Sequence, residues 1–275
     1  MKKLFDKRRL TQVICAILYN CNITGFAKGT IFRGASKALC VPGLNCYSCP
    51  GAVAACPLGS LQSALVGSKY KIPYYVLGML ILFGVLFGRM ICAFFCPFGL
   101  IQELLYKIPL PKIKKNKVTR ILSYGKYIVL GILVLWMPVA FGYPAFCKYV
   151  CPAGTLEAGV PLLLKNEALR ELADVLFNWK TGVLLFVILM VIFLYRGFCR
   201  FICPLGAIYS FFNKVSFFGV EVNKNLCTGC NACVSSCKLD VKQVGDRECI
   251  QCGECIAKCN VDAIKCKRNV RNVEK

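Results

Sequence analysis

Long apolar runs alternate with basic segments along most of the chain. Each run approaches the roughly 20 residues with which an α-helix crosses about 30 Å of hydrocarbon. The runs cover residues 10–27, 72–88, 127–146 and 181–195. A buried core helix would explain any one run, but basic residues flank the whole set. The last run is short, yet Lys180 and Arg196 at its ends can snorkel to the interface. The pattern predicts four transmembrane helices.

Polar residues interrupt the first of these runs. Gln12, Asn20, Asn22 and Thr24 fall within it. A signal peptide is the alternative for this basic and then apolar N-terminus, but no clear small-residue cleavage site follows the run. We therefore expect it to be a retained first transmembrane helix.

Basic residues gather on one side of the predicted spans. They are dense at the N-terminus, in the loop between the second and third runs, and beyond Arg196. The loop 142–180 instead carries the acidic residues Glu157, Glu167, Glu171 and Asp174. By the positive-inside rule, both termini lie in the cytoplasm, and the protein is a multi-pass protein of the cytoplasmic membrane. Segment 28–71 is also rich in basic residues and does not decide the orientation.

Composition agrees with a membrane protein. Hydrophobic residues make up 57% of the chain, and the mean hydropathy is +0.59. In a soluble protein the net charge of +22 would suggest nucleic acid as a partner. Here the basic residues lie at the ends of apolar runs, which fits membrane lipid as the partner and no nucleic acid. The chain has no histidine, which excludes His-ligated haem and Cys2His2 zinc.

Cysteines near the C-terminus form two runs of one spacing, Cys-x2-Cys-x2-Cys-x3-Cys. The first run starts at Cys227 and the second at Cys249. This is the spacing of bacterial two-cluster ferredoxins, in which the fourth cysteine of each run ligates the other cluster. The expected ligands are Cys227, Cys230, Cys233 and Cys259 for one [4Fe–4S] cluster, and Cys249, Cys252, Cys255 and Cys237 for the second.

Two other readings of this motif are weaker in physical terms. Zinc takes four ligands, often as two separated pairs, and has no use for a paired run of four. Disulfides are rare in a reducing compartment. The residue after each fourth cysteine is usually Pro but is Lys238 or Asn260 here, a difference that removes no ligand. The motif indicates a protein that moves electrons.

A second cysteine pattern repeats within the apolar part. The tetrad Cys-Pro-x-Gly begins at Cys56, Cys96, Cys151 and Cys203. A further cysteine precedes the last three tetrads by four residues, at Cys92, Cys147 and Cys199, whereas Cys46-x2-Cys49 precedes the first. Residues 10–110 and 121–216 therefore look like two copies of one unit, each with an outer and an inner motif. We expect a membrane domain over 1–216 and a small α+β ferredoxin-like domain over 217–275.

The repeat can bring two half-sites together on each membrane face. One Cys-x3-Cys pair supplies only half of a four-cysteine site. The inner site is expected from Cys92, Cys96, Cys199 and Cys203. The outer site is drawn from Cys46, Cys49, Cys56, Cys147 and Cys151, one more than needed. Such sites would hold one or two further iron–sulfur clusters. A proline directly after a ligand suits the first position of a new helix.

Other chemistry remains open for these cysteines. Disulfides are a competitor on the outer face, and zinc or a redox-active dithiol is possible on either face. Cys40 and Cys266 fit neither pattern. Cys15 and Cys21 are expected to be small buried hydrophobic residues.

Four spans, repeated Cys-x3-Cys-Pro motifs and the two-cluster ferredoxin segment resemble the NapH/NosR-type membrane polyferredoxins. The segment from Asn45-Cys46-Tyr47-Ser48-Cys49-Pro50 to Cys56-Pro57-Leu58-Gly59 is similar to a sub-branch known as 4Fe-4S binding proteins. The resemblance implies electron transfer between the cytoplasmic side, or quinol in the membrane, and a partner oxidoreductase. NosR-like proteins add a flavin-binding domain, and no segment here is long enough to be one.

The hypothesis that follows is an electron conduit across the cytoplasmic membrane. It would be an electron-transfer component of an oxidoreductase system rather than a self-contained enzyme. An acidic ferredoxin or flavodoxin is the expected partner at the basic cytoplasmic surface. The alternative is a membrane-anchored ferredoxin that acts as a redox sensor or as a metal or cofactor assembly factor. A 30 Å layer is long for one electron step, so the Cys-Pro segments would have to dip into the bilayer.

Overall fold

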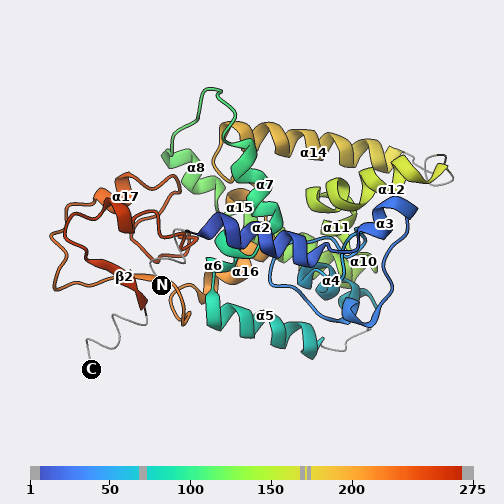
Figure 1. The fold of residues 1–275 in the computed structure, drawn as a ribbon, viewed down its shortest axis with the longest axis horizontal. Helices are drawn as coiled ribbons and strands as arrows, with labels where there is room; N and C mark the ends of the chain where they lie inside the picture. Colours follow the sequence, from blue (N-terminus) through green and yellow to red (C-terminus); the bar gives the residue numbers. More distant parts are fainter. Residues whose placement is uncertain (1–6, 68–72, 168–170, 172–174, 268–275) are drawn as a thin grey trace.

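The chain folds into many short helices followed by a two-stranded sheet, as the computed structural model in Figure 1 shows. The structure describes residues 7–67, 73–167, 171 and 175–267. Asp174 and the first six residues, which hold part of the basic N-terminus used above for orientation, lie outside this part. The helices carry the predicted inner and outer motifs, and the sheet lies with the ferredoxin-like segment at the other end of the molecule.

Two helices are long and apolar enough to cross a membrane by length and composition. One covers Lys117–Phe141 and consists of α8 (Lys117–Leu122), α9 (Gly125–Val129), the π-helical η2 (Leu130–Trp136) and α10 (Met137–Phe141). The other is α14 (Val175–Phe193). The first begins ahead of the predicted run and ends before it, because Gly142 adopts a left-handed φ of 69° that terminates the helix.

The other two predicted spans are shorter. The first is broken into α2 (Arg8–Tyr19) and α3 (Ile23–Lys28), so the prediction of one continuous helix over 10–27 is wrong. Asn20 donates to the carbonyl of Ala16, and Asn22 donates to that of Pro50, and such side chains compete with helical hydrogen bonds.

Neither of these helices reaches across a bilayer core alone. With 12 residues, α2 is about 18 Å long, and α5 (Tyr74–Phe87), with 14, is about 21 Å long. Two of the four predicted spans therefore reach spanning length within the described residues.

The polarity of α2 is inverted relative to a helix of a soluble protein. Apart from Arg9 at its start, its exposed side chains are apolar: Leu10, Val13, Ile14, Ile17 and Leu18. Its buried residues are polar, Arg8 and Gln12. A soluble helix turns its apolar stripe inward, so the exposed face of α2 is suited to an apolar environment.

The Cys-Pro pair of each Cys-Pro-x-Gly tetrad opens a helix, as predicted, whereas Cys49-Pro50 does not. Pro97 and Pro204 begin α7 (Pro97–Leu105) and α16 (Pro204–Phe212), with the cysteine as the N-cap residue. Pro57 begins α4 (Pro57–Gly67). Proline is favoured there because its missing N–H has no partner in the first turn anyway. The remaining helices around these motifs are α6 (Met90–Phe94), α11 (Ala145–Tyr149), the π-helical η3 (Gly154–Gly159), α12 (Val160–Lys165) and α15 (Gly197–Phe201).

The C-terminal part is closed by one pair of strands. β1 (Val220–Val222) pairs antiparallel with β2 (Ile264–Cys266), and Val220 lies opposite Cys266. Between them lie α17 (Ala232–Ser235) and the short 3-10 helix η4 (Ile256–Lys258); a further 3-10 helix, η1 (Ala35–Ala38), lies in the N-terminal part. Leu239, Val241 and Ile250 join the same buried cluster as Leu44 and Phe98, so the two parts share one core.

Candidate iron–sulfur sites

One cavity of about 220 Å³ lies in the C-terminal part. Five cysteines line it: Cys233, Cys237, Cys249, Cys252 and Cys255. Four of them are the complete set expected for the second cluster. Of the set expected for the first cluster, Cys233 lines this cavity, Cys227 and Cys230 are exposed, and Cys259 is half-buried.

The two cysteine runs share an unusual backbone. Two residues after the first cysteine of each run, Gly229 and Gln251 have φ of 73° and 54°. Four residues after it, Asn231 and Gly253 have φ of 55° and 79°. Left-handed residues turn the chain tightly and direct consecutive N–H groups inward. Both runs are therefore shaped to wrap a compact anionic group, even where a non-glycine residue has to adopt this conformation.

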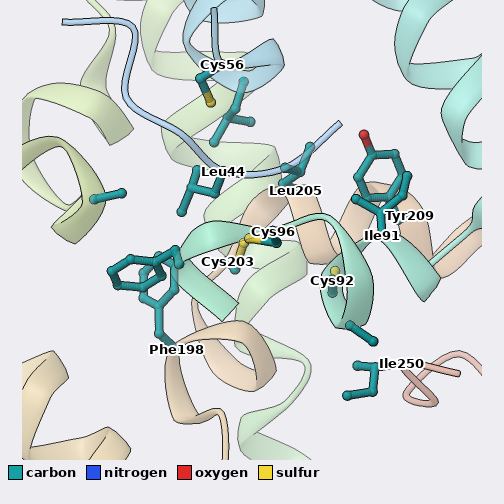
Figure 2. Close-up of a cluster of buried hydrophobic side chains, with 14 of the residues drawn as sticks. Leu44, Cys56, Ile91, Cys92, Cys96, Phe198, Cys203, Leu205, Tyr209 and Ile250 are labelled. Atoms are coloured by element: carbon teal, nitrogen blue, oxygen red, sulfur yellow. The ribbon is translucent and has the colours of Figure 1, made fainter. Parts of the chain in front are cut away.

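The four cysteines of the predicted inner site are buried together. Cys92, Cys96, Cys199 and Cys203 are each at most 6% exposed. Figure 2 shows Cys96 and Cys203 next to each other with Cys92 nearby. The thiols also act on one another electrostatically: burial raises the pKa of Cys203, and Cys199, Cys92 and Cys96 raise it further. A cation is needed to keep such thiolates ionised, and the irons of a cluster supply one.

At this site, two arginines each contact a cysteine of the other half of the predicted repeat. Arg196 donates to the carbonyl oxygen of Cys92 at 2.6 Å, and Arg89 donates to that of Cys199 at 3.4 Å. Both side chains are fully buried, so the expectation that Arg196 snorkels to the interface is wrong. Each arginine sits three residues before the first cysteine of its own motif. That repeated position is the signal by which the sequence could have revealed them.

The glycines of the two inner motifs make room for these contacts. A Cβ on Gly99 would lie 2.8 Å from the carbonyl oxygen of Cys92, and one on Gly206 would lie 3.3 Å from that of Cys199. The arginine of the opposite half lies behind each. The last position of the tetrad is therefore small because a carbonyl and a guanidinium pass close to it.

Each of the two buried arginines pairs with a carboxylate, and the two carboxylates come from different parts of the chain. Glu103 accepts from Arg196 at 2.7 Å and from Arg8 at 2.6 Å. Burial alone would raise the pKa of Glu103, but Arg196 and Arg8 outweigh it and lower this pKa to about 2. In the second half, aligning Cys203 with Cys96 places Ser210 where the first half has Glu103.

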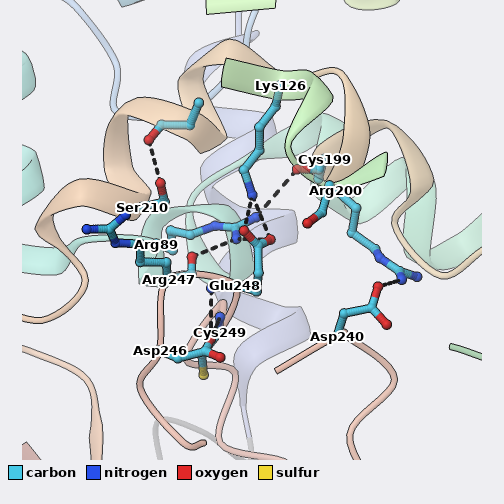
Figure 3. A network of polar contacts seen from close by, with 12 residues as sticks. Arg89, Lys126, Cys199, Arg200, Ser210, Asp240, Asp246, Arg247, Glu248 and Cys249 are labelled. Carbon is cyan, nitrogen blue, oxygen red and sulfur yellow. Dashed lines mark hydrogen bonds and ion pairs between the residues drawn. The ribbon is translucent and has the colours of Figure 1, made fainter. Parts of the chain in front are cut away.

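The carboxylate beside Arg89 comes from the C-terminal part. Glu248 accepts from Arg89 at 3.1 Å and from Lys126 at 2.5 and 2.6 Å, as Figure 3 shows. Glu248 directly precedes Cys249, which lines the C-terminal cavity. Arg89 therefore links that cavity to the backbone of Cys199 at the inner site.

A second cavity, of about 320 Å³, contains four of the five candidate outer cysteines. Cys46, Cys56, Cys147 and Cys151 line it, and Lys180 lies at its wall. Cys49 is buried but is not among the lining residues, so it is the candidate for the spare one of the five. Burial raises the pKa of Cys46, and the neighbouring Cys151 raises it further.

Unpaired buried N–H groups near the inner and outer cysteine sites fit an iron–sulfur cluster. Within the described residues, four buried amide or guanidinium nitrogens have no partner: Gln12 Nε2, Arg89 Nε, Asn45 Nδ2 and Gln62 Nε2. Arg89 borders the inner site, while Gln62 accepts from the backbone N–H of Cys147 at the outer one. Gln102 already donates to the Cys199 sulfur at 2.9 Å. Buried donors rarely remain unpaired, and the sulfurs of a cluster accept such bonds.

The alternatives of zinc and disulfides gain no support. All 21 cysteines lie in the described part of the chain, and all are free thiols. No three histidine, cysteine or acidic side chains among the described residues gather closely enough to hold one metal ion. A cubane differs from a single ion because it spreads its four ligands over four irons.

The comparisons with known proteins point to the same chemistry. A family model described as a 4Fe-4S binding domain matches residues 74–116, 126–166 and 175–222, which contain three Cys-x3-Cys pairs. An uncharacterised protein of Methanocaldococcus jannaschii, MJ0750, is 30% identical over 171 residues, which cover 60% of this chain and 64% of the relative. A second, MJ0749, is 26% identical over 198 residues, which cover 67% and 65%.

A third relative is a ferredoxin-type protein by its name. The methylamine utilization ferredoxin-type protein MauN of Paracoccus denitrificans is 29% identical over 186 residues, which cover 64% of this chain and 58% of MauN. The matches thus span less than two thirds of each relative's length. No solved structure matches the chain. The resemblance to the NapH/NosR type in particular stays a prediction, while the family match and the relatives support this chain as a 4Fe-4S ferredoxin-type protein.

Proposed function

We propose that this protein is a membrane-bound iron–sulfur protein that relays electrons between a cytoplasmic or quinol donor and a partner oxidoreductase across the membrane. The observation that carries the proposal is the link Cys249–Glu248–Arg89–Cys199. It joins the cavity of the ferredoxin-like segment to the inner cysteine site through two side chains. A ferredoxin that was only tethered to a membrane would not need to dock its cluster-binding loop on a second cysteine site.

Exposed apolar side chains support the membrane location. The two helices of spanning length expose Ile128, Trp136 and Phe186, among others. The outward face of α2 is apolar as well, and that of α5 includes Leu82 and Val85. Soluble proteins rarely leave apolar surface of this extent uncovered, so lipid is the fitting neighbour for these helices.

The ferredoxin-like segment has one docked end and one free end. The cavity-lining Cys249 directly follows Glu248, which pairs with Arg89 beside the inner site, whereas Cys227 and Cys230 are exposed. Lys224 and Lys258 are exposed as well. A basic surface beside an accessible cluster site favours an acidic electron carrier such as ferredoxin or flavodoxin. The free end is therefore the proposed place of exchange with the cytoplasm.

The chain's own residues set the conditions for electron transfer. A bound [4Fe–4S] cluster would supply one-electron chemistry at each four-cysteine site. Arg89 and Arg196 hold positive charge beside the inner cysteines, and Gln102 donates to the Cys199 sulfur. Such charges and hydrogen bonds favour the more negative, reduced state of a cluster. Burial of all four inner cysteines keeps water away from the site.

The first test is the iron and acid-labile sulfide content of anaerobically purified protein, with EPR of the reduced sample. About sixteen irons per chain would support four [4Fe–4S] clusters, and about eight would leave only the ferredoxin-like segment loaded. Transfer across the membrane is then measured in vesicles with the Cys96→Ser, Cys203→Ser double variant. Loss of transfer with the ferredoxin-like clusters intact is expected, and unchanged transfer would contradict the relay.

A further inference from the structure

The segment that leads to the outer cysteine Cys46 contacts the inner cysteine site. Gly43 packs directly on the inner ligand Cys96: an added Cβ would lie 2.8 Å from the Cys96 Cα and 2.8 Å from the carbonyl oxygen of Phe95. Both are backbone atoms that cannot swing aside. Only glycine fits at this approach, so the loop is built to contact the inner site.

The next three residues lead from the inner ligand to the outer ones. Burial raises the pKa of both the Cys96 and Cys56 thiols, and the backbone of Leu44 lies close enough to Cys96, and that of Asn45 to Cys56, to offset part of this rise. Cys46 itself lines the outer cavity. Figure 2 shows the buried Leu44 side chain between Cys56 and Cys96. Inner and outer cysteines are thus connected through consecutive backbone units.

Two hydrogen bonds from different helices fix this segment. Tyr209 of α16, fully buried, donates its hydroxyl to the carbonyl oxygen of Pro42 at 2.9 Å. Asn20, just after α2, donates to the Asn45 side chain at 2.8 Å. Tyr209 follows the inner ligand Cys203 on the same helix. Helix α16, which follows the inner cysteine Cys203, therefore also holds the segment in place.

We propose that residues 43–46 form the bridge by which the inner and outer cysteine sites exchange electrons. The proposal rests on the relay function above and specifies its membrane step. From Leu44 to Cys46 the chain spans at most about 7 Å, against about 30 Å for the hydrocarbon layer. One electron leaves the reduced inner site and enters the oxidised outer site, and the cytoplasmic donor, or dithionite in the test, replaces it. The side chains of the bridge take part in no reaction; the bridge has only to contact both cysteine sites.

The test compares Gly43→Ala with Gly182→Ala. The Cβ at position 43 collides with backbone, whereas a Cβ at position 182 meets nothing within 4 Å. Iron content, the EPR spin–spin interaction between the reduced inner and outer sites, and transfer in dithionite-loaded vesicles are measured. With iron retained, Gly43→Ala should weaken the spin–spin interaction and slow transfer by roughly tenfold or more, as small displacements of reacting groups do. Gly182→Ala should match the wild type.

Each other outcome has one meaning. A wild-type spin–spin interaction and transfer rate in fully loaded Gly43→Ala would overturn the bridge and leave the relay standing. If Gly43→Ala loses iron, the bridge is tested instead by the iron content and transfer rate of Tyr209→Phe, because this variant removes only the hydroxyl that holds Pro42. Slower transfer with full iron would support the bridge, and an unchanged rate would overturn it. Wild-type protein with about eight irons, or with full iron and no transfer, would refute the relay itself.

Discussion

Arg196 donates a hydrogen bond of 2.6 Å to the carbonyl oxygen of Cys92, a residue of the other half of the predicted repeat. Arg89 makes the reciprocal contact with Cys199. Each half thus contributes a buried cation to the cysteine pair of its counterpart. The predicted inner site consequently draws its positive charge, like its candidate ligands, from both halves.

Removal of this charge should change the potential of the inner site. Arg196→Gln is expected to lower the midpoint potential by about 60 mV, the one-electron equivalent of a 1.4 kcal/mol interaction. The sign follows because a cation stabilises the more negative reduced state. An EPR-monitored redox titration measures the shift. Arg196→Lys, which keeps the charge, serves as the control and should shift the potential less.

The contact between Glu248 and its two cations should stabilise the docking of the ferredoxin-like segment. Glu248→Gln leaves Arg89 and Lys126 buried without a carboxylate, so we expect a loss of about 3–5 kcal/mol in the free energy of unfolding. Glu254→Gln is the matched control. The Glu254 side chain is 48% exposed, and its loss should cost at most about 1 kcal/mol. Equal effects of the two variants would contradict the docking role.

Protonation of Glu103 at low pH should lower the free energy of unfolding of the protein. Burial opposes ionisation of this group, but Arg196 and Arg8 lower its pKa from 4.5 to about 2 in the folded state. A lowered folded pKa gives stability that is present above pH 4.5 and is lost as the pH falls toward 2. The shift corresponds to about 3 kcal/mol. The pH dependence of unfolding in this window should be weaker in Glu103→Gln than in the wild type, and identical curves would exclude this role.

Cys49 should be dispensable for the outer site. Cys49→Ser is expected to keep the full iron content, because this cysteine does not line the outer cavity. Cys56→Ser, the matched substitution of a lining residue, should lose about four irons per chain. Iron analysis of the two purified variants is sufficient. Iron loss in Cys49→Ser alone would reverse the assignment of ligand and spare.

Local spacing made part of this architecture readable from the sequence. The cysteines from 237 to 255 are close in the chain, and they line one cavity. The proline of each Cys-Pro-x-Gly tetrad begins a helix because proline acts on its own backbone. Features of this kind depend on neighbouring residues only, and a sequence exposes them directly.

Features that depend on distant partners were not predicted. Arg196 looked like a snorkelling residue because its partners, Glu103 and Cys92, are some hundred positions away. The break of the first helix depends on Asn22 finding the carbonyl of Pro50. The contact of Gly43 with Cys96 likewise joins two loops that share no spacing rule. Tertiary packing decides such pairs.

The second half has Ser210 at the position that corresponds to Glu103 in the first half, and this difference has a consequence for assembly. A membrane part with two matching halves would offer two equivalent places for the ferredoxin-like segment, and either arginine could receive it. Arg196 already has Glu103, so Arg89 is the arginine left to pair with Glu248. This asymmetry leaves the two predicted halves with one docking orientation for the ferredoxin-like segment.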